Sequence, residues 1–202
     1  MNIVIISGSH RQNSQSLKVS NWLAAHLKTK SAKSEIIDLS GNPIPFWSEE
    51  AWNAESDLAK EMSPYLEKIE KADGLILVSP EWHGMVPSGL KNFLLYVSSQ
   101  HAAHNPSLLV GVSASRGGTY PIAELRMSGY KNNRMVYIPD HLIVSNCENV
   151  MNDPALDSGE KADQYIKNRA DYSLNVLLAY AKALKTMRDE HDLLSSDYPF
   201  GM

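Results

Sequence analysis

The chain has one cysteine, no long apolar run and no concentration of positive charge, and each of these absences excludes a class of protein. Cys147 is the only cysteine in 202 residues, so the chain can form neither an internal disulfide nor a cysteine-rich metal site. No apolar run approaches the roughly 18 to 20 residues that a membrane-spanning helix requires. The formal net charge is -4 and no long basic run is present, which argues against nucleic-acid binding.

The same features predict where the protein works and how many domains it has. A single cysteine suits a reducing compartment, and the first residues contain neither a basic leader nor a small-residue cleavage site. We therefore expect a soluble, cytoplasmic protein. With 202 residues, 43% of them hydrophobic, the chain can bury one substantial core. We expect one domain over residues 1–190 and a tail over residues 191–202 that is either disordered or folded over a neighbouring subunit.

Short apolar runs alternate with amphipathic segments along the chain. The apolar runs predict five strands: Ile3–Ile6, Ile36–Leu39, Leu75–Val78, Leu108–Val112 and Met135–Val144. Helical spacing of apolar residues predicts five helices: Leu17–Leu27, Leu58–Ile69, Leu90–Val97, Ile122–Tyr130 and Lys161–Leu184. Such alternation predicts right-handed crossovers and a parallel sheet that helices cover on both faces, an α/β fold.

The turn after the first strand is rich in hydroxyl groups and poor in glycine. A turn that leads from a buried strand into a helix directs backbone N–H groups and the positive end of the helix dipole at one point, where an anion binds well. Hydroxyl and guanidinium donors surround this point: Ser9, Ser14, Ser16 and Arg11. A diphosphate loop would need two more glycines after Gly8. The turn therefore favours a phosphate monoester, although Ser14 or Ser16 could simply cap the helix.

A second distinctive loop, Ser79–Asn92, follows the third predicted strand. In a flavodoxin-like strand order, ligands bind beyond the carboxyl ends of the first and third strands, so both loops should border one crevice. Pro80 and Gly84 stiffen the turn and let the backbone lie beside a planar ligand. Trp82 and His83 offer ring surfaces and polar edges.

Together the two loops resemble those of the NADPH-dependent FMN reductase family. The first resembles the family's G-S-x-R-x-x-S-x-[NS] phosphate loop, and the matching positions are Gly8, Ser9, Arg11, Ser14 and Ser16. The second resembles P-E-Y-N-G-S followed by P-x-x-L-K-N, and the matching positions are Pro80, Glu81, Gly84, Pro87, Leu90, Lys91 and Asn92. The resemblance covers residues 2–145 and implies a flavodoxin-like three-layer sandwich with a five-stranded parallel sheet in the order 2-1-3-4-5.

The resemblance also implies bound FMN, and a third loop, Ser113–Pro121, is expected beside the flavin ring. Its alternative interpretation is a flexible turn in which Thr119 caps the next helix. Arg116 could face a phosphate of the nicotinamide nucleotide. No catalytic side chain and no metal ligand are expected. The predicted cofactor-binding residues are Ser9, Arg11, Ser14, Gln15, Ser16, Pro80, Glu81, Trp82, His83, Gly84, Ser115, Arg116, Gly117 and Gly118.

The second loop departs from the family pattern at three positions. Trp82 replaces the usual tyrosine and keeps an aromatic face, whereas Met85 replaces the usual serine. His83 replaces the usual asparagine. It is either a titratable group beside the flavin or a turn residue without a chemical role. These departures bear on the choice of substrate more than on the cofactor.

The resemblance implies an enzyme that transfers hydride from NADPH or NADH to FMN and passes electrons to a small acceptor in a ping-pong cycle. The acceptor could be a quinone, an azo or nitro compound, a metal oxyanion or free flavin. The alternatives are a flavodoxin-type electron carrier without reductase activity and a catalytically silent nucleotide sensor. The family also implies a homodimer or homotetramer, and we expect neither nucleic acid nor a membrane as partner.

Several other classes fit the sequence poorly. The first loop lacks the cysteine of a cysteine-dependent phosphatase, and Ser115 does not lie in a G-x-S-x-G elbow. His101 and His104 have no glutamate base or third ligand at the spacing of a catalytic zinc site, so we expect solvated loop histidines. The aromatic loop Gly41–Asn53 is either a surface loop packed by its own rings or a wall of the site.

Overall fold

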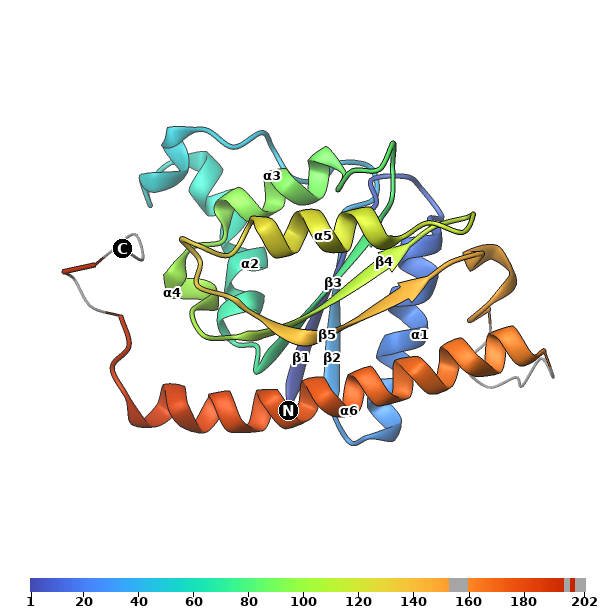
Figure 1. Cartoon of the computed structure of the whole chain (residues 1–202). Helices are drawn as coiled ribbons and strands as arrows, with labels where there is room; N and C mark the ends of the chain where they lie inside the picture. Colours follow the sequence, from blue (N-terminus) through green and yellow to red (C-terminus); the bar gives the residue numbers. More distant parts are fainter. Residues whose placement is uncertain (153–159, 195–196, 199–202) are drawn as a thin grey trace.

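The computed structural model describes residues 1–152, 160–194 and 197–198 and shows an open, five-stranded parallel sheet. The strand order is β2-β1-β3-β4-β5, all neighbouring pairs are parallel, and the predicted fold class is confirmed. Figure 1 shows the strands fanned between two layers of helices. The strands are β1 (Asn2–Ser7), β2 (Lys33–Asp38), β3 (Gly74–Pro80), β4 (Pro106–Val112) and β5 (Val136–Val144).

The helices divide into two groups, one on each face of the sheet (Figure 1). One face is covered by α1 (Gln15–Thr29) and α6 (Lys161–Glu190), whose apolar side chains form one core with alternate residues of the central strands. The other face is covered by α2 (Asp57–Glu70), α3 (Ser88–Tyr96) and α5 (Thr119–Met127), which form a second core. Burial of both sheet faces explains why β1, β3 and β4 are almost continuously apolar.

The two edge strands are the least regular part of the sheet: β2 starts earlier than predicted, and β5 contains an irregularity. β2 begins at Lys33, three residues before the predicted start, because an edge strand tolerates polar, partly exposed residues that an apolar-run criterion overlooks. β5 changes its register with β4 beside Pro139, which has no N–H for the ladder. There the Arg126 guanidinium donates to the carbonyl oxygens of Ile138 (3.0 Å) and Asp140 (2.9 Å), which satisfies backbone acceptors at the irregularity.

The predicted helix Ile122–Tyr130 was displaced toward the C-terminus. In the structure α5 begins at Thr119 after Gly118, which has a φ of 113° in a region favourable to glycine, and it ends at Met127. The final helix is longer than predicted and reaches Glu190. Three short elements had no apolar periodicity to reveal them: the 3-10 turns η1 (Glu49–Trp52) and η2 (Cys147–Asn149), and the one-turn helix α4 (Ser99–Ala102).

Most apolar side chains of α3 and the residue after it belong to the core. Leu90 and Phe93 have no exposed area and Val97 is 5% exposed, so packing on the sheet accounts for them. Leu95, on the opposite side of α3, is 63% exposed, and Met127 at the end of α5 is 83% exposed.

The described part of the tail contacts its own chain. Arg134 donates from Nη1 to the carbonyl oxygen of Leu193 (3.2 Å) and from Nη2 to that of Tyr198. These bonds were not anticipated, because carbonyl acceptors carry no sequence signal. Other parts of the predicted tail, including Pro199 and Phe200, lie outside the described residues. Among the described helices, none is both long and apolar enough to cross a membrane.

Candidate functional site

The first two loops meet at the carboxyl edge of the sheet, as their positions in the sequence predict. The Gly8 N–H donates to the carbonyl oxygen of Val78 (2.8 Å), which joins the end of β1 to β3. The His10 ring lies 4.4 Å from the Trp82 ring, centroid to centroid, at an interplanar angle of 85°. The adjacent β1 and β3 thus bring a hydroxyl-rich turn and an aromatic turn into direct contact.

The first loop contains buried polar atoms without a protein partner. Ser14 caps α1 by accepting the N–H of Leu17 (3.0 Å), so the capping interpretation is confirmed at this position. Ser16 is not engaged in this way: it is 1% exposed, and its Oγ has no hydrogen bond. Among the described residues, eight buried side-chain polar atoms lack a partner, and half of them belong to Ser7, His10, Gln15 and Ser16. Such groups are costly to bury unpaired, and the hydroxyls among them suit a phosphate.

Arg11 completes the donor set of the first loop. Its backbone N–H donates to Ser9 Oγ (3.3 Å), which fixes the start of the turn, while its side chain is exposed. No ion pair engages the Arg11 guanidinium within the described residues. The loop therefore combines a free cation, serine hydroxyls and the start of α1, and this chemistry fits the phosphate monoester of FMN.

The second loop is a two-residue hairpin. Trp82 and Met85 exchange both backbone hydrogen bonds (3.2 and 2.9 Å). His83 and Gly84, between them, have φ values of 51° and 71°. Two successive positive φ angles characterise a type I′ turn, in which asparagine followed by glycine is the favoured pair. His83 therefore adopts a backbone conformation that asparagine accommodates more readily, which supports its interpretation as a turn residue.

Glu81 connects the second loop to the third. Its Oε2 accepts the backbone N–H of Gly118 (2.6 Å) and that of Tyr120 (3.3 Å). These donors lie at the start of α5, where unpaired N–H groups favour an anion. The cap of α5 is thus a carboxylate from another loop, and the alternative in which Thr119 caps the helix is wrong. The Glu81 side chain is directed at this helix end.

The third loop lies beside the second, and its tip is open. Ser145 Oγ donates to the carbonyl oxygen of Gly117 (2.7 Å), which ties this part of the loop to the end of β5. Ser115 and Arg116, by contrast, have exposed side chains. The loop therefore offers a fixed backbone near Gly117 and exposed polar side chains at its tip.

Sequence reasoning assigned no contact to three residues that join the loops in or near the site. His10 occupies an unspecified position of the first motif, so no pattern pointed to its contact with Trp82. The Tyr120 ring borders Gly84 across the third and second loops. Asn92, noted only as a motif match, donates to the carbonyl oxygen of Pro45 (2.6 Å) and accepts the N–H of Trp47 (2.9 Å). Asn92 therefore binds the aromatic loop to α3.

The aromatic loop packs partly by its own rings, as one of its two interpretations predicts. Trp47 and Trp52 make an edge contact with centroids 5.3 Å apart, although Trp52 is 78% exposed. With Leu66 and Leu95 they border a groove of about 700 Å³ between this loop, α2 and α3. The groove extends toward His101 of α4, away from the three loops at the carboxyl edge of the sheet.

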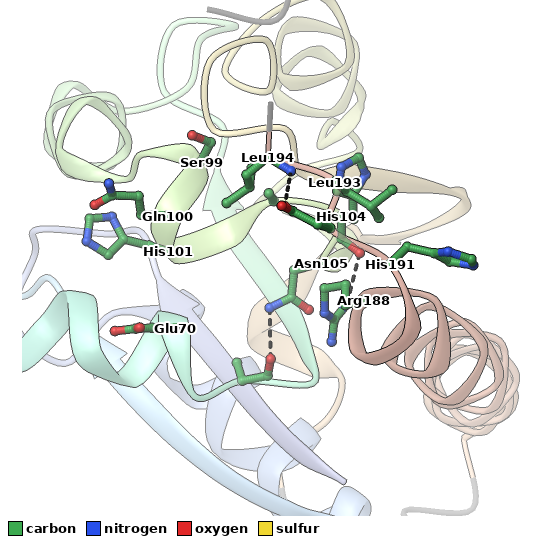
Figure 2. Close-up of a pocket in the computed structure, with 13 residues that line it drawn as sticks. Glu70, Ser99, Gln100, His101, His104, Asn105, Arg188, His191, Leu193 and Leu194 are labelled. Carbon is green, nitrogen blue, oxygen red and sulfur yellow. Dashed lines mark hydrogen bonds between the residues drawn. The ribbon is translucent and has the colours of Figure 1, made fainter. Parts of the chain in front are cut away.

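A separate cavity of about 290 Å³ lies at the opposite, amino end of the sheet (Figure 2). Two of its polar side chains donate to the backbone: Arg188 to the carbonyl oxygen of His104 (2.9 Å), and Asn105 to that of Ala72 (3.0 Å). Asn105 Oδ1 and His104 Nε2 are buried without a partner among the described residues. Burial lowers the pKa of His104 and of His101. His101 also accepts the N–H of Ser98 through Nδ1 (3.1 Å). These partly buried histidines are not the solvated residues that the sequence predicted.

The strand order defines a flavodoxin-like α/β protein, and the three loops of the candidate site lie at the carboxyl edge of its sheet. The model of the family described as NADPH-dependent FMN reductase matches residues 1–149. The chain belongs to this family. All three loops of the candidate site lie within the matched residues.

Individual relatives agree with this assignment. The FMN-dependent NADPH-azoreductase of Staphylococcus aureus (strain USA300) is 31% identical over 125 residues, which cover 61% of this chain and 66% of that protein, just under two thirds of its length. A flavoenzyme NAD(P)H:(acceptor) oxidoreductase from Paracoccus denitrificans superposes with a TM-score of 0.62 at 16% identity and covers 92% of this chain and 97% of that one.

An NAD(P)H:quinone oxidoreductase from Methanothermobacter marburgensis has a TM-score of 0.59 at 17% identity, with 86% of this chain and 96% of that chain covered. At this level of identity, the two structural likenesses establish the fold.

Proposed function

We propose that this chain is an FMN-dependent oxidoreductase that takes hydride from NADPH or NADH and reduces a small acceptor. The observation that carries the proposal is the buried, unpartnered Ser16 hydroxyl of the first loop, in a loop that also carries the exposed Arg11 side chain and contacts the aromatic second loop. The acceptor class is a quinone, an azo or nitro compound, a metal oxyanion or free flavin, and the two substrates use one open face in turn. Membership in the family supports this proposal.

The proposed roles of the residues follow from where they lie. Arg11, Ser9 and Ser16 bind the phosphate, and Ser14 maintains the start of α1. The backbone of the His83–Gly84 turn and of Gly117 borders the flavin ring and tunes it with N–H groups. FMN supplies the redox chemistry when bound, so the protein needs no catalytic acid of its own.

Other predicted contacts divide into structural and substrate-facing groups. Pro80 ends β3 and is buried, whereas Gln15 begins α1 with an unpartnered Oε1. Arg116 is exposed and available to a phosphate of the nicotinamide nucleotide. Trp82 is proposed to flank the flavin ring in place of the family's tyrosine.

Purified protein is expected to be yellow, to release FMN rather than FAD on denaturation, and to lose its yellow colour when NADPH or NADH is added without oxygen. The first loop lacks the glycines that a diphosphate needs, which explains the preference for FMN. Absorbance at the flavin band, followed by reoxidation with a panel of quinone, azo and metal-oxyanion acceptors, provides the measurement. Protein that binds FMN but is not bleached by either nucleotide would be a flavodoxin-type carrier.

We also propose that the protein is a homodimer or homotetramer. The supporting observation is a groove of about 440 Å³ between α3 and α5, bordered by Leu94, Leu95 and Tyr130, with exposed Met127 nearby on α5. Sedimentation velocity at micromolar concentration is expected to show at least a dimer. Leu95→Glu should shift the distribution toward monomer, and Lys28→Glu on exposed α1 surface should leave it unchanged. A monomeric wild-type protein would reject this proposal.

A further inference from the structure

His10 lies between the first loop and the second, in contact with both. Its backbone oxygen accepts the N–H of Gly41 (3.0 Å), which fixes the main chain of the turn. Its ring meets the Trp82 ring edge to face, with centroids 4.4 Å apart. On the other side, a Cβ built on Gly89 would lie 3.2 Å from His10 Nδ1. The imidazole is therefore packed between the Trp82 indole and the backbone at the start of α3.

The polar edge of this imidazole does not explain its position. His10 Nδ1 is buried and makes no hydrogen bond with the described residues, so no hydrogen bond within the described chain holds the ring here. What the ring does make is the aromatic contact, in the edge-to-face geometry that aromatic pairs prefer. The contact with Trp82, rather than a hydrogen bond, is the interaction that fits this arrangement.

The backbone of the second loop is already fixed by other groups. The Trp82–Met85 hairpin bonds set its turn, and Glu81 binds it to the start of α5. These contacts leave the χ angles of Trp82 free, and its side chain is only partly buried. The indole orientation therefore depends on the ring packed against it.

We infer that His10 is a positioning residue that sets the orientation of the Trp82 indole at the flavin ring. The inference rests on the proposed function, because it takes Trp82 as the aromatic neighbour of the flavin. It assigns to the variable position of the first motif a role at the ring, distinct from the phosphate-binding role of Arg11 and Ser16. The phosphate loop thereby also contributes to ring recognition.

The test compares His10→Ala, Trp82→Ala and the double variant by titration with FMN and with riboflavin. His10→Ala is expected to lower the affinity for FMN and for riboflavin by the same factor, about 3- to 10-fold, which is the effect expected from the loss of one aromatic contact. In the Trp82→Ala background the His10→Ala change should have no further effect. His10→Phe, which keeps a ring, should restore affinity, and His191→Ala at an exposed position serves as control.

Gly89→Ala tests the same contact without removing His10. The added Cβ would press on Nδ1 from the α3 side, while alanine favours the helix. We expect near-ultraviolet circular dichroism of the ligand-free protein to change in Gly89→Ala and to return toward that of His10→Ala in the double variant, with no loss of thermal stability. A purely structural role for His10 would change stability but not this indole signal.

The outcomes separate the inference from the proposed function. If His10→Ala lowers the affinity for FMN but not for riboflavin, His10 contacts the phosphate and the inference is wrong. Additive effects of His10→Ala and Trp82→Ala on affinity would also contradict it. If the wild-type protein binds no flavin, the proposed function fails, and the circular dichroism of the ligand-free variants still decides whether His10 orients Trp82. Coincident difference spectra for His10→Ala and Trp82→Ala, with recovery in His10→Phe, are the expected result.

Discussion

Replacing Arg11 and Ser16 together by alanine is expected to weaken FMN binding about 100-fold or more and to leave riboflavin binding nearly unchanged. Ser16 Oγ is buried without a partner, and the Arg11 guanidinium makes no ion pair with the described residues. Both are therefore free to bind phosphate. Each hydrogen bond to a charged group contributes about 1.5 to 3 kcal/mol, and about 1.4 kcal/mol is tenfold in affinity. Fluorescence titration of the ligand-free protein with each flavin measures the difference.

Two controls make this result specific. Lys28→Ala removes an exposed cation from the far end of α1 and should leave FMN affinity unchanged. Ser14→Ala removes the cap of α1 and should lower the free energy of unfolding by about 0.5 to 2 kcal/mol. An equal loss of FMN and riboflavin affinity in the Arg11/Ser16 variant would show that the loop does not bind phosphate.

Gly111→Ala is expected to lower the melting temperature markedly and to abolish flavin binding. A Cβ at this position would lie 2.0 Å from the carbonyl oxygen of Gly118, so backbone must move. Overpacking of this kind costs about 1 to 3 kcal/mol or more, and about 1 kcal/mol shifts the melting temperature of a domain of this size by roughly 2 to 4 °C. The third loop would be displaced from Glu81, which binds it through Gly118.

Gly74→Ala provides the matched control, because it also adds a methyl group to a central strand. There the nearest atom, at 3.1 Å, is Cδ1 of Ile3, the end of a flexible side chain that can move aside. Differential scanning calorimetry should therefore show a lower melting temperature for Gly111→Ala than for Gly74→Ala, and FMN titration should show lost binding only in Gly111→Ala. Similar melting temperatures and similar FMN affinities for Gly111→Ala and wild type would contradict the rigid contact between β4 and the third loop.

The sequence predicted the fold well because its signals were strong and local. Continuous apolar strands alternated with amphipathic helices, and this pattern has few topological solutions. The errors lie where local pattern gave little information. Lys33–Glu35 at the edge strand is polar, and the start of α5 depends on a glycine φ and on a carboxylate from a distant loop.

The candidate site was predictable as a set of loops and less so as a set of contacts. Motif spacing placed the first and second loops at one edge, and their contact through His10 and Trp82 agrees with that placement. The partners of Glu81 and Asn92 were not predictable, because both side chains bind backbone groups, which every residue type carries. The flavin contacts of the individual residues stay predictions.

Because the Glu81 carboxylate joins the second loop to the third, we expect the two loops to change together in evolution. The carboxylate accepts the N–H of Gly118, 37 positions further along the chain and directly before α5, so neither loop is complete without the other. In a chimaera that receives only the third loop of a relative, the N–H groups at the start of α5 would no longer be matched to the position of the Glu81 carboxylate. Changes of acceptor preference are therefore expected to arise by substitution at exposed positions such as Ser115 and Arg116, or by exchange of both loops together.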